Sequence, residues 1–273
     1  MKAMLIFALV CPIFSQTFEV ALLGVSSGDS PSKVFETYNP LVHHLTRKVY
    51  SGMVKGGIKL RVYPSEQDLV KVLKEGNIHI ARLKPQTYLM LQQELPELKL
   101  CVGEVLNNQF FREGFLIVQK RNAVRGFGDF KSYPFAFGPK MDPLLDIYTK
   151  ALLNQKGLKF KDLQAKYLTD PEKVLHFVEV GRVRAGVVEA GALPQEELES
   201  RFRIFGKLKA PGMVWVMTDA LFPSTRENVQ AELLSLSERP LLNHLGIDYY
   251  TQISDHDLAE FKTALHQAIR FYK

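Results

Sequence analysis

This chain lacks the features that define several large classes of protein. Of its two cysteines, Cys11 lies in an apolar leader-like segment, so the processed chain would keep Cys101 alone and could form no intramolecular disulfide. The sequence has no cysteine cluster, HExxH pair or EF-hand loop, and we therefore expect no metal and no cofactor. Past residue 14, no apolar run approaches the ~20 residues that cross a bilayer.

Signatures of nucleic-acid binding and of catalysis are also missing. The formal net charge is +6, and it is spread along the chain without a basic block or an aromatic-rich RNA-binding signature, so nucleic acid is not an expected partner. No nucleophile elbow, phosphate-binding loop or recognisable His/Asp set occurs. The sequence therefore favours a protein that is not an enzyme.

The N-terminal segment has the features of a targeting signal. Lys2 is followed by an almost wholly apolar run over residues 3–14, and Ser15 is a small residue. This pattern is typical of a short secretory signal peptide, with cleavage after residue 15 or 16. The alternative is a core strand or an anchor over residues 3–10, which is less favoured because residues 18–25 already have the pattern of the first strand.

Export raises the question of a membrane tether. A lipid on Cys11 is the less favoured alternative, because the preceding Val10 is bulky where a lipid-attachment box needs a small residue. We therefore predict a signal peptide over residues 1–15 and a periplasmic, monomeric mature protein. Cys101 is expected to be a buried small side chain in a strand.

Strand-like and helix-like segments alternate along the rest of the chain. Apolar alternation or short apolar runs predict strands at 18–25, 58–62, 78–83, 98–105, 114–119, 134–137, 163–168, 183–189, 202–208 and 213–217. Apolar residues at helical spacing predict helices at 35–49, 66–73, 143–155, 171–180, 226–236 and 256–271, with another that begins at Pro85. This order predicts an α/β fold of mostly parallel sheets flanked by helices.

The pattern also predicts two lobes. Residues 76–88 and 181–189 repeat the same order of turn, strand and loop. The strand-like segments 115–120 and 208–215 are expected to cross between the lobes and to form a two-strand hinge. The expected division assigns residues 16–119 and 212–273 to the first lobe and residues 120–211 to the second.

The segment from Glu75 to Tyr88 carries the most information. Gly76 suits the left-handed residue after a helix, and Pro85 suits the first turn of the next one. The free N–H groups of that helix would face the end of the preceding strand, where open α/β sheets bind ligands. The segment resembles the G-x-h-D-h-A-x-x-x-P-x-x-Y block of periplasmic binding proteins of the phosphate, phosphite and phosphonate type.

Other segments resemble the same family in the expected order. They are residues 38–41, 68–73, 114–118, 127–138, 151–158 and 181–186, so the resemblance extends from residue 18 to about residue 217. It implies the type II periplasmic-binding-protein fold and an exported solute-binding protein. Such a protein captures a small molecule between its lobes and delivers it to an ABC transporter permease or presents it to a membrane sensor kinase. Two alternatives stay open, namely an enzyme on a similar fold and a degenerate binding protein kept for protein contacts.

One segment departs from the family pattern. The family follows its F-A-F strand with a Ser-Thr-Ser-Gly run that binds an oxyanion at a helix start, whereas this chain has residues 138–145, which include Asp142 and Pro143. Asp142 is a natural N-cap, and it also brings negative charge to the position of the anion. We therefore predict weak or no binding of phosphate, phosphite and simple phosphonates. The ligand is expected to be neutral, cationic or zwitterionic, or to reach Lys84 or Lys140.

Candidate ligand-binding residues end strands or open helices, and each has a structural alternative. The candidates are Ser26, Tyr38, Lys84, Tyr88, Lys140, Asp142 and Glu189. The tyrosines could instead pack the core, the lysines and Glu189 could be solvated, Ser26 could be a turn residue, and Asp142 could serve as a cap. The adjacent His43 and His44 are expected to face different directions on a helix, which excludes a metal site built from that pair.

Overall fold

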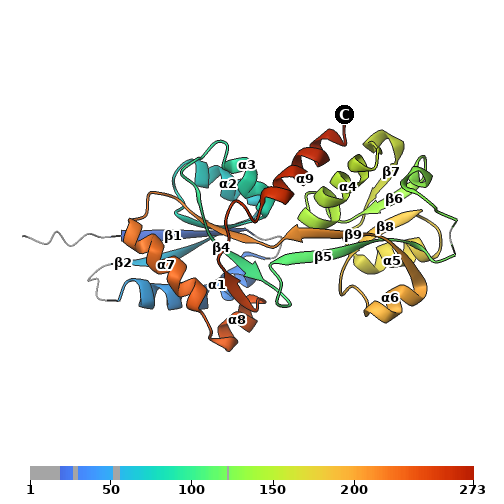
Figure 1. The fold of residues 1–273 in the computed structure, drawn as a ribbon. Coiled ribbons are helices and arrows are strands. Elements are labelled where there is room, and N and C mark those ends of the chain that lie inside the picture. The colour runs from blue at the N-terminus through green and yellow to red at the C-terminus, as the bar shows by residue number, and fades with distance from the viewer. Residues whose placement is uncertain (1–18, 27–29, 52–55, 122) are drawn as a thin grey trace, which may run out of the picture.

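The computed structural model describes residues 19–26, 30–51, 56–121 and 123–273, and over these residues the chain forms two β-sheets side by side, each flanked by helices (Figure 1). The predicted α/β class is confirmed. The predicted signal peptide and Cys11 lie outside the described residues.

The first sheet has the strand order β11-β4-β10-β3-β1-β2. Its strands are β1 (Glu19–Ser26), β2 (Gly56–Tyr63), β3 (Ile80–Leu83), β4 (Lys99–Val105), β10 (Val214–Met217) and β11 (Tyr249–Thr251). Strand β1 pairs in parallel with β2 and β3, whereas β10 runs antiparallel to both β3 and β4. The carboxyl ends of β1, β2 and β3 therefore share one edge of the sheet.

The second sheet has the order β7-β6-β8-β5-β9. Its strands are β5 (Phe111–Gln119), β6 (Pro134–Phe137), β7 (Gln164–Tyr167), β8 (Ala185–Glu189) and β9 (Phe202–Pro211). Strands β6, β7 and β8 are parallel, and β5 runs against β8 and β9. Each sheet thus has a parallel group of three strands beside the strands that connect the lobes.

Helices cover both faces of both sheets (Figure 1). Helices α1 (Pro31–Val49), α7 (Pro223–Ser235) and α8 (Arg239–Leu245) lie on one face of the first sheet, and α2 (Glu66–Lys74) and α3 (Pro85–Leu91) lie on the other. The second sheet carries α5 (Pro171–Glu179) and α6 (Gln195–Arg201) on one face. Its other face carries the π-helical turn η2 (Pro143–Tyr148), α4 (Thr149–Gln155) and α9 (Ala259–Arg270). Short 3₁₀ turns occur at η1 (Phe127–Phe130) and η3 (Phe160–Asp162).

Local chemistry explains where many of these elements begin and end. Ser30 and Ser65 cap α1 and α2 by accepting backbone N–H groups, and Pro85 opens α3. Gly76 follows α2 with φ of 75°, a conformation that suits glycine. Cys101 is fully buried in β4, and burial raises the pKa of its thiol to about 12, so it is the inert core residue that the sequence predicts.

Sheet membership corrects one expectation about the crossings between lobes. The sequence places residues up to 119 in the first lobe, but β5 pairs along its length with β8 and β9 of the second sheet. The first crossing is therefore the segment 106–110, between β4 and β5, and the second is 212–213, between β9 and β10. Helix α9, also expected in the first lobe, packs mainly on α4 and η2.

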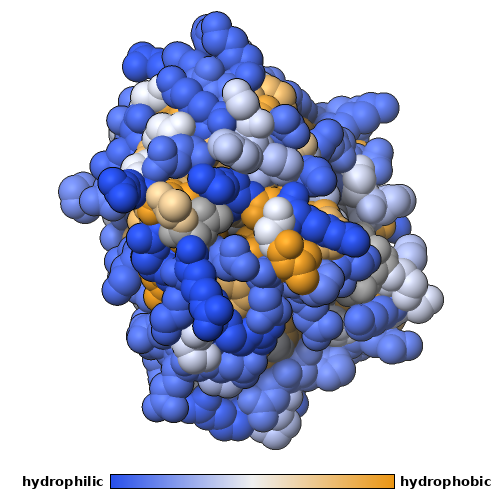
Figure 2. Space-filling view, turned by 90° about the vertical axis from the view of Figure 1, so that its right-hand side faces the viewer, coloured by the Kyte–Doolittle hydropathy of each residue, from blue (hydrophilic) through white to orange (hydrophobic). Residues whose placement is uncertain are grey.

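The end of the second lobe presents a mostly hydrophilic surface. Figure 2 shows this end with apolar residues confined to a few small patches. The larger apolar side chains of this lobe, such as Phe135, Phe137 and Phe202, are buried instead.

Candidate functional site

The start of η2 is built around Asp142, which follows β6. One carboxylate oxygen, Oδ1, accepts hydrogen bonds from the backbone N–H groups of Leu144 and Leu145, at 2.9 and 2.7 Å. The backbone carbonyl of Asp142 also accepts from the N–H groups of Asp146 and Ile147. The predicted N-cap is therefore confirmed, and these N–H groups are already bonded within the chain.

The second carboxylate oxygen of Asp142 faces an arginine that sequence reasoning missed. Arg112 of β5 has its Nη1 3.5 Å from Asp142 Oδ2, and its Nη2 pairs with Glu189 at the end of β8. These three side chains, which we call the Arg112 cluster, leave one negative charge in excess. Arg112 lies next to Glu113 at the start of β5, before an apolar run, so its charge alone did not mark it as a site residue.

A buried ion pair supports the same helical turn from behind. Asp146 is 1% exposed, lies 2.7 Å from Lys150 Nζ, and accepts the backbone N–H of Met141 at 2.8 Å. Burial raises the pKa of the Asp146 carboxyl, and the neighbouring ammonium opposes this effect without cancelling it. The hydrogen bond to Met141 fixes the loop that leads into η2.

A cavity of about 540 Å³, which we call the seam pocket, lies where the two lobes meet. The first lobe contributes residues of α2 and α3, and the second contributes Lys140 and Met141. The first-lobe lining residues are Glu66, Gln67, Val70, Lys74, Lys84, Gln86, Thr87, Met90, Leu91 and Glu94. Two of the predicted ligand-binding residues, Lys84 and Lys140, are therefore brought to one cavity.

A hydrogen bond joins the lobes at this pocket. The side-chain Nε2 of Gln86 donates to the backbone carbonyl of Met141 at 2.7 Å, and Gln86 is only 1% exposed. Its Oε1 has no hydrogen-bond partner within the described part of the chain. Met141 has φ of 61°, in the left-handed region that non-glycine residues seldom adopt.

The predicted tyrosines do not line the seam pocket. Tyr88 is 1% exposed, and its hydroxyl donates to Asp255 at 2.8 Å. Tyr38 is buried beside Trp215, and burial raises the pKa of its hydroxyl to about 12. Ser26 is half-buried at the end of β1, beside residues 27–29, which are outside the described part. The structure thus gives both tyrosines the packing role named as their alternative.

A second arginine–carboxylate pair stabilises the first lobe. Arg82 of β3 makes two contacts with Glu104 of β4, at 2.5 and 2.7 Å, and the indole N–H of Trp215 donates to the same carboxylate at 2.8 Å. Glu104 is 7% exposed. The pair ties three adjacent strands together, and its partners fully occupy the carboxylate.

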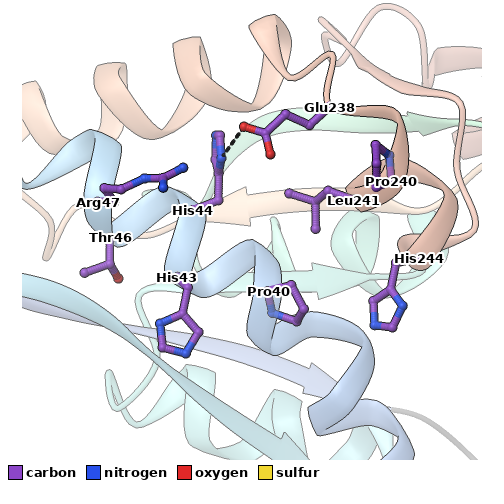
Figure 3. Close-up of a pocket in the computed structure, with 9 residues that line it drawn as sticks. All are labelled: Pro40, His43, His44, Thr46, Arg47, Glu238, Pro240, Leu241 and His244. Atoms are coloured by element: carbon purple, nitrogen blue, oxygen red, sulfur yellow. Dashed lines mark ion pairs between the residues drawn. The ribbon is translucent and has the colours of Figure 1, made fainter.

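Another cavity, of about 800 Å³, lies between α1 and α8 (Figure 3). His43 and His44 point in different directions there, as predicted, and His44 is buried with Glu238 at 3.2 Å and Glu232 at 3.6 Å. No group of three potential metal ligands occurs among the residues that the structure describes. These contacts join α1 to α7 and α8, so we assign His44 a structural role.

Two α/β lobes with a cavity at their seam define a two-lobed ligand-binding protein. The sequence profile of the periplasmic substrate-binding proteins of phosphonate ABC transporters matches residues 23–258. The chain belongs to this family, and the resemblance seen in the sequence is confirmed. Proteins of this family are periplasmic solute-binding components of transporters and not enzymes. No described helix is long and apolar enough to cross a membrane.

Solved structures share the fold at low sequence identity. XAC2383 from Xanthomonas citri, bound to ATP, has a TM-score of 0.74 at 13% identity, with 93% of this chain and 99% of that chain covered. PhnD1 from Prochlorococcus marinus, in complex with methylphosphonate, has a TM-score of 0.64 at 13% identity, covering 91% and 98%. The aliphatic sulphonate binding protein SsuA from Escherichia coli has a TM-score of 0.52 at 17% identity, covering 94% and 89%. No protein with a curated description matches the sequence.

Proposed function

We propose that this protein captures a small molecule between its two lobes and delivers it to the permease of an ABC transporter. The family match supports the transport role, and the seam pocket, lined from both lobes, is the observation that carries the binding role. A ligand in such a pocket contacts both lobes only when they are close together, so its binding favours the closed arrangement. The sensor and enzyme alternatives have no support among the described residues.

The two crossings between the sheets are suited to a hinge. They are the short segments 106–110 and 212–213. The named strands of the described residues form two separate sheets, and no strand belongs to both. Rotation about two short segments changes few backbone angles and leaves both sheets intact. Helix α9 and the bond from Gln86 to Met141 are the contacts that such a motion must rearrange.

The ligand contacts that we propose are a subset of the sequence candidates. Lys84 and Lys140 line the seam pocket, whereas Asp142 and Glu189 both pair with Arg112 in the Arg112 cluster. PhnD1 holds methylphosphonate, but here the N–H groups at the start of η2 are bonded to Asp142. We therefore propose weak binding of phosphate, phosphite and simple phosphonates at that helix start.

The proposal is tested by a ligand screen followed by solution scattering. A thermal-shift screen of the mature protein against oxyanions, organic acids, amines and pyrimidines should find a ligand that raises the melting temperature, because it binds only the folded state. The same ligand should reduce the radius of gyration. If a tight ligand leaves the scattering curve unchanged, capture between closing lobes is wrong.

Export, oligomeric state and domain boundaries complete the proposal. The mature protein is proposed to begin after residue 15, to reside in the periplasm without a lipid on Cys11, and to be a monomer. The hydrophilic end of the second lobe supports the monomer (Figure 2). The first lobe is proposed to give way to the second between residues 105 and 111, and to resume after residue 211.

A further inference from the structure

The charges of the seam pocket are not balanced within the pocket. Lys74 pairs with Glu94 at 2.6 Å, and Lys84 lies 3.5 Å from Glu66. Lys140 has no carboxylate partner within the described part of the chain, and its ammonium lies 5.1 Å from the ring centre of Tyr167. The pocket therefore holds one positive charge in excess, which suits one carboxylate on a ligand.

The pocket also holds an unused hydrogen-bond acceptor. Gln86 forms part of the wall and is almost wholly buried, its amide nitrogen is fixed on Met141, and its amide oxygen has no donor. Buried acceptors are normally paired, since an unpaired one has lost its water without replacement. The missing partner is an N–H or O–H group, and because Glu66 in the same wall is already paired with Lys84, this donor must come from a ligand; an ammonium group supplies such donors.

The remaining surface of the pocket is apolar and adaptable. Met90 is 54% exposed and Met141 is 47% exposed, whereas most other large apolar residues are buried. Both methionines line the pocket together with Val70 and Leu91. Thioether side chains adjust to the shape of an apolar group, and the backbone N–H and carbonyl of Met141 are fixed by Asp146 and Gln86.

We propose that the seam pocket binds a small zwitterion with an apolar side chain, of the chemical class of the apolar amino acids. Its carboxylate pairs with Lys140, its ammonium donates to Gln86 Oε1, and its side chain packs on Met90 and Met141. This inference rests on the proposed function, because it names the ligand class that the lobes would enclose. It places the ligand at the seam and not at the start of η2, where Asp142 and Glu189 lie.

Calorimetry with three probes tests the ligand class. L-leucine, L-methionine and L-phenylalanine are titrated singly, and at least one is expected to bind. Two analogues of the amino acid that binds best are then titrated. Its amide lacks the carboxylate, and its deaminated acid lacks the ammonium group. Each analogue should bind at least about tenfold more weakly, because each loses a charge-assisted contact. If none of the three binds, or if either analogue binds equally well, the ligand class is wrong.

Variants test the location of the site. Lys140→Ala should weaken the binding of the best amino acid about tenfold, and Met90→Ala should weaken it about threefold. Matched controls are Lys131→Ala and Ile269→Ala, which remove an exposed lysine and an equally exposed apolar residue elsewhere. If Lys140→Ala has no more effect than Lys131→Ala, the seam pocket is not the site, whereas ligand capture as such is unaffected. If binding follows these predictions but scattering shows no closure, the pocket assignment stands and the closure mechanism fails.

Discussion

Replacing Asp142 with asparagine separates its two roles at the start of η2. The asparagine side chain keeps an oxygen that can accept the N–H groups of Leu144 and Leu145, but it removes the negative charge that faces Arg112. After the change, Arg112 and Glu189 balance each other. We therefore expect Asp142→Asn to fold normally and to admit an anion at the helix start more easily than the wild type does.

The size of the effect follows from Coulomb's law. Two unit charges about 4 Å apart repel by about 1 kcal/mol in water and by about 4 kcal/mol at the effective dielectric constant near a protein surface. Removing the Asp142 charge should therefore raise the affinity for phosphate at least about fivefold. The cost in stability should stay below about 1 kcal/mol, because the contact with Arg112 is partly solvated. Asp142→Ala also removes the cap and should cost a further 1–2 kcal/mol or so.

Calorimetric titration with phosphate and methylphosphonate measures the first effect, and urea unfolding followed by circular dichroism measures the second. Asp129→Asn is the matched control, because Asp129 also accepts two backbone N–H groups, those of Arg125 and Gly126. It precedes β6 in the chain, whereas Asp142 follows it, so the two carboxylates lie toward opposite ends of that strand. The gain in affinity should shrink with added salt, since screening weakens the repulsion.

Two results would refute this reasoning. Micromolar or tighter phosphate binding by the wild type would mean that Asp142 does not block the helix start. A gain in Asp142→Asn no larger than that in Asp129→Asn would mean that the charge is irrelevant there. Replacing residues 142–144 with Ser-Thr-Ser should likewise create some oxyanion affinity, since it restores uncharged donors.

Three further predictions concern stability and processing. Glu104→Gln should lower the free energy of unfolding in urea by about 3 kcal/mol or more, because it leaves Arg82 without its buried charged partner. Glu179→Gln, at the exposed pair with Arg201, should lower it by less than about 1 kcal/mol. Equal losses would contradict the argument from burial. Burial lowers the pKa of His79, whose Nδ1 accepts the N–H of Leu22, so below about pH 6.5 the unfolded chain binds a proton that the folded chain does not, and stability should fall as the pH drops from 7 to 5.5. In the His79→Asn variant, stability should fall less over the same pH range. An unchanged pH dependence of stability would exclude His79 as its source. Mass spectrometry of the native protein should find a chain without residues 1–15, and intact Met1 on the native protein would contradict export.

Features that depend on neighbouring residues were predictable from the sequence. Gly76 ends α2 and Pro85 opens α3 where the pattern predicts them, and Asp142 caps η2. Each of these roles is decided by the backbone preferences or hydrogen bonds of a few consecutive residues. The alternation of strands and helices is equally local, because it follows from apolar spacing.

The membership of β5 in the second sheet was not predictable in this way. Its apolar run predicts a strand near residues 114–119, but the same run would suit either sheet. Its partners are β8 and β9, whose positions are far along the chain. The hydrogen-bond partner of Tyr88 was not predictable for a similar reason, since Asp255 comes from the C-terminal segment.

The sequence by itself determined the class of fold, the local caps and turns, and the family, because these depend on spacing and on short-range backbone chemistry. Only the tertiary structure decided how the site is assembled. Arg112, Asp142 and Glu189 meet because β5, η2 and β8 pack together, and the seam pocket exists because α2 and α3 approach residues 140–141. These contacts join residues that no local rule relates, and the packing of whole elements brings them within reach of one another.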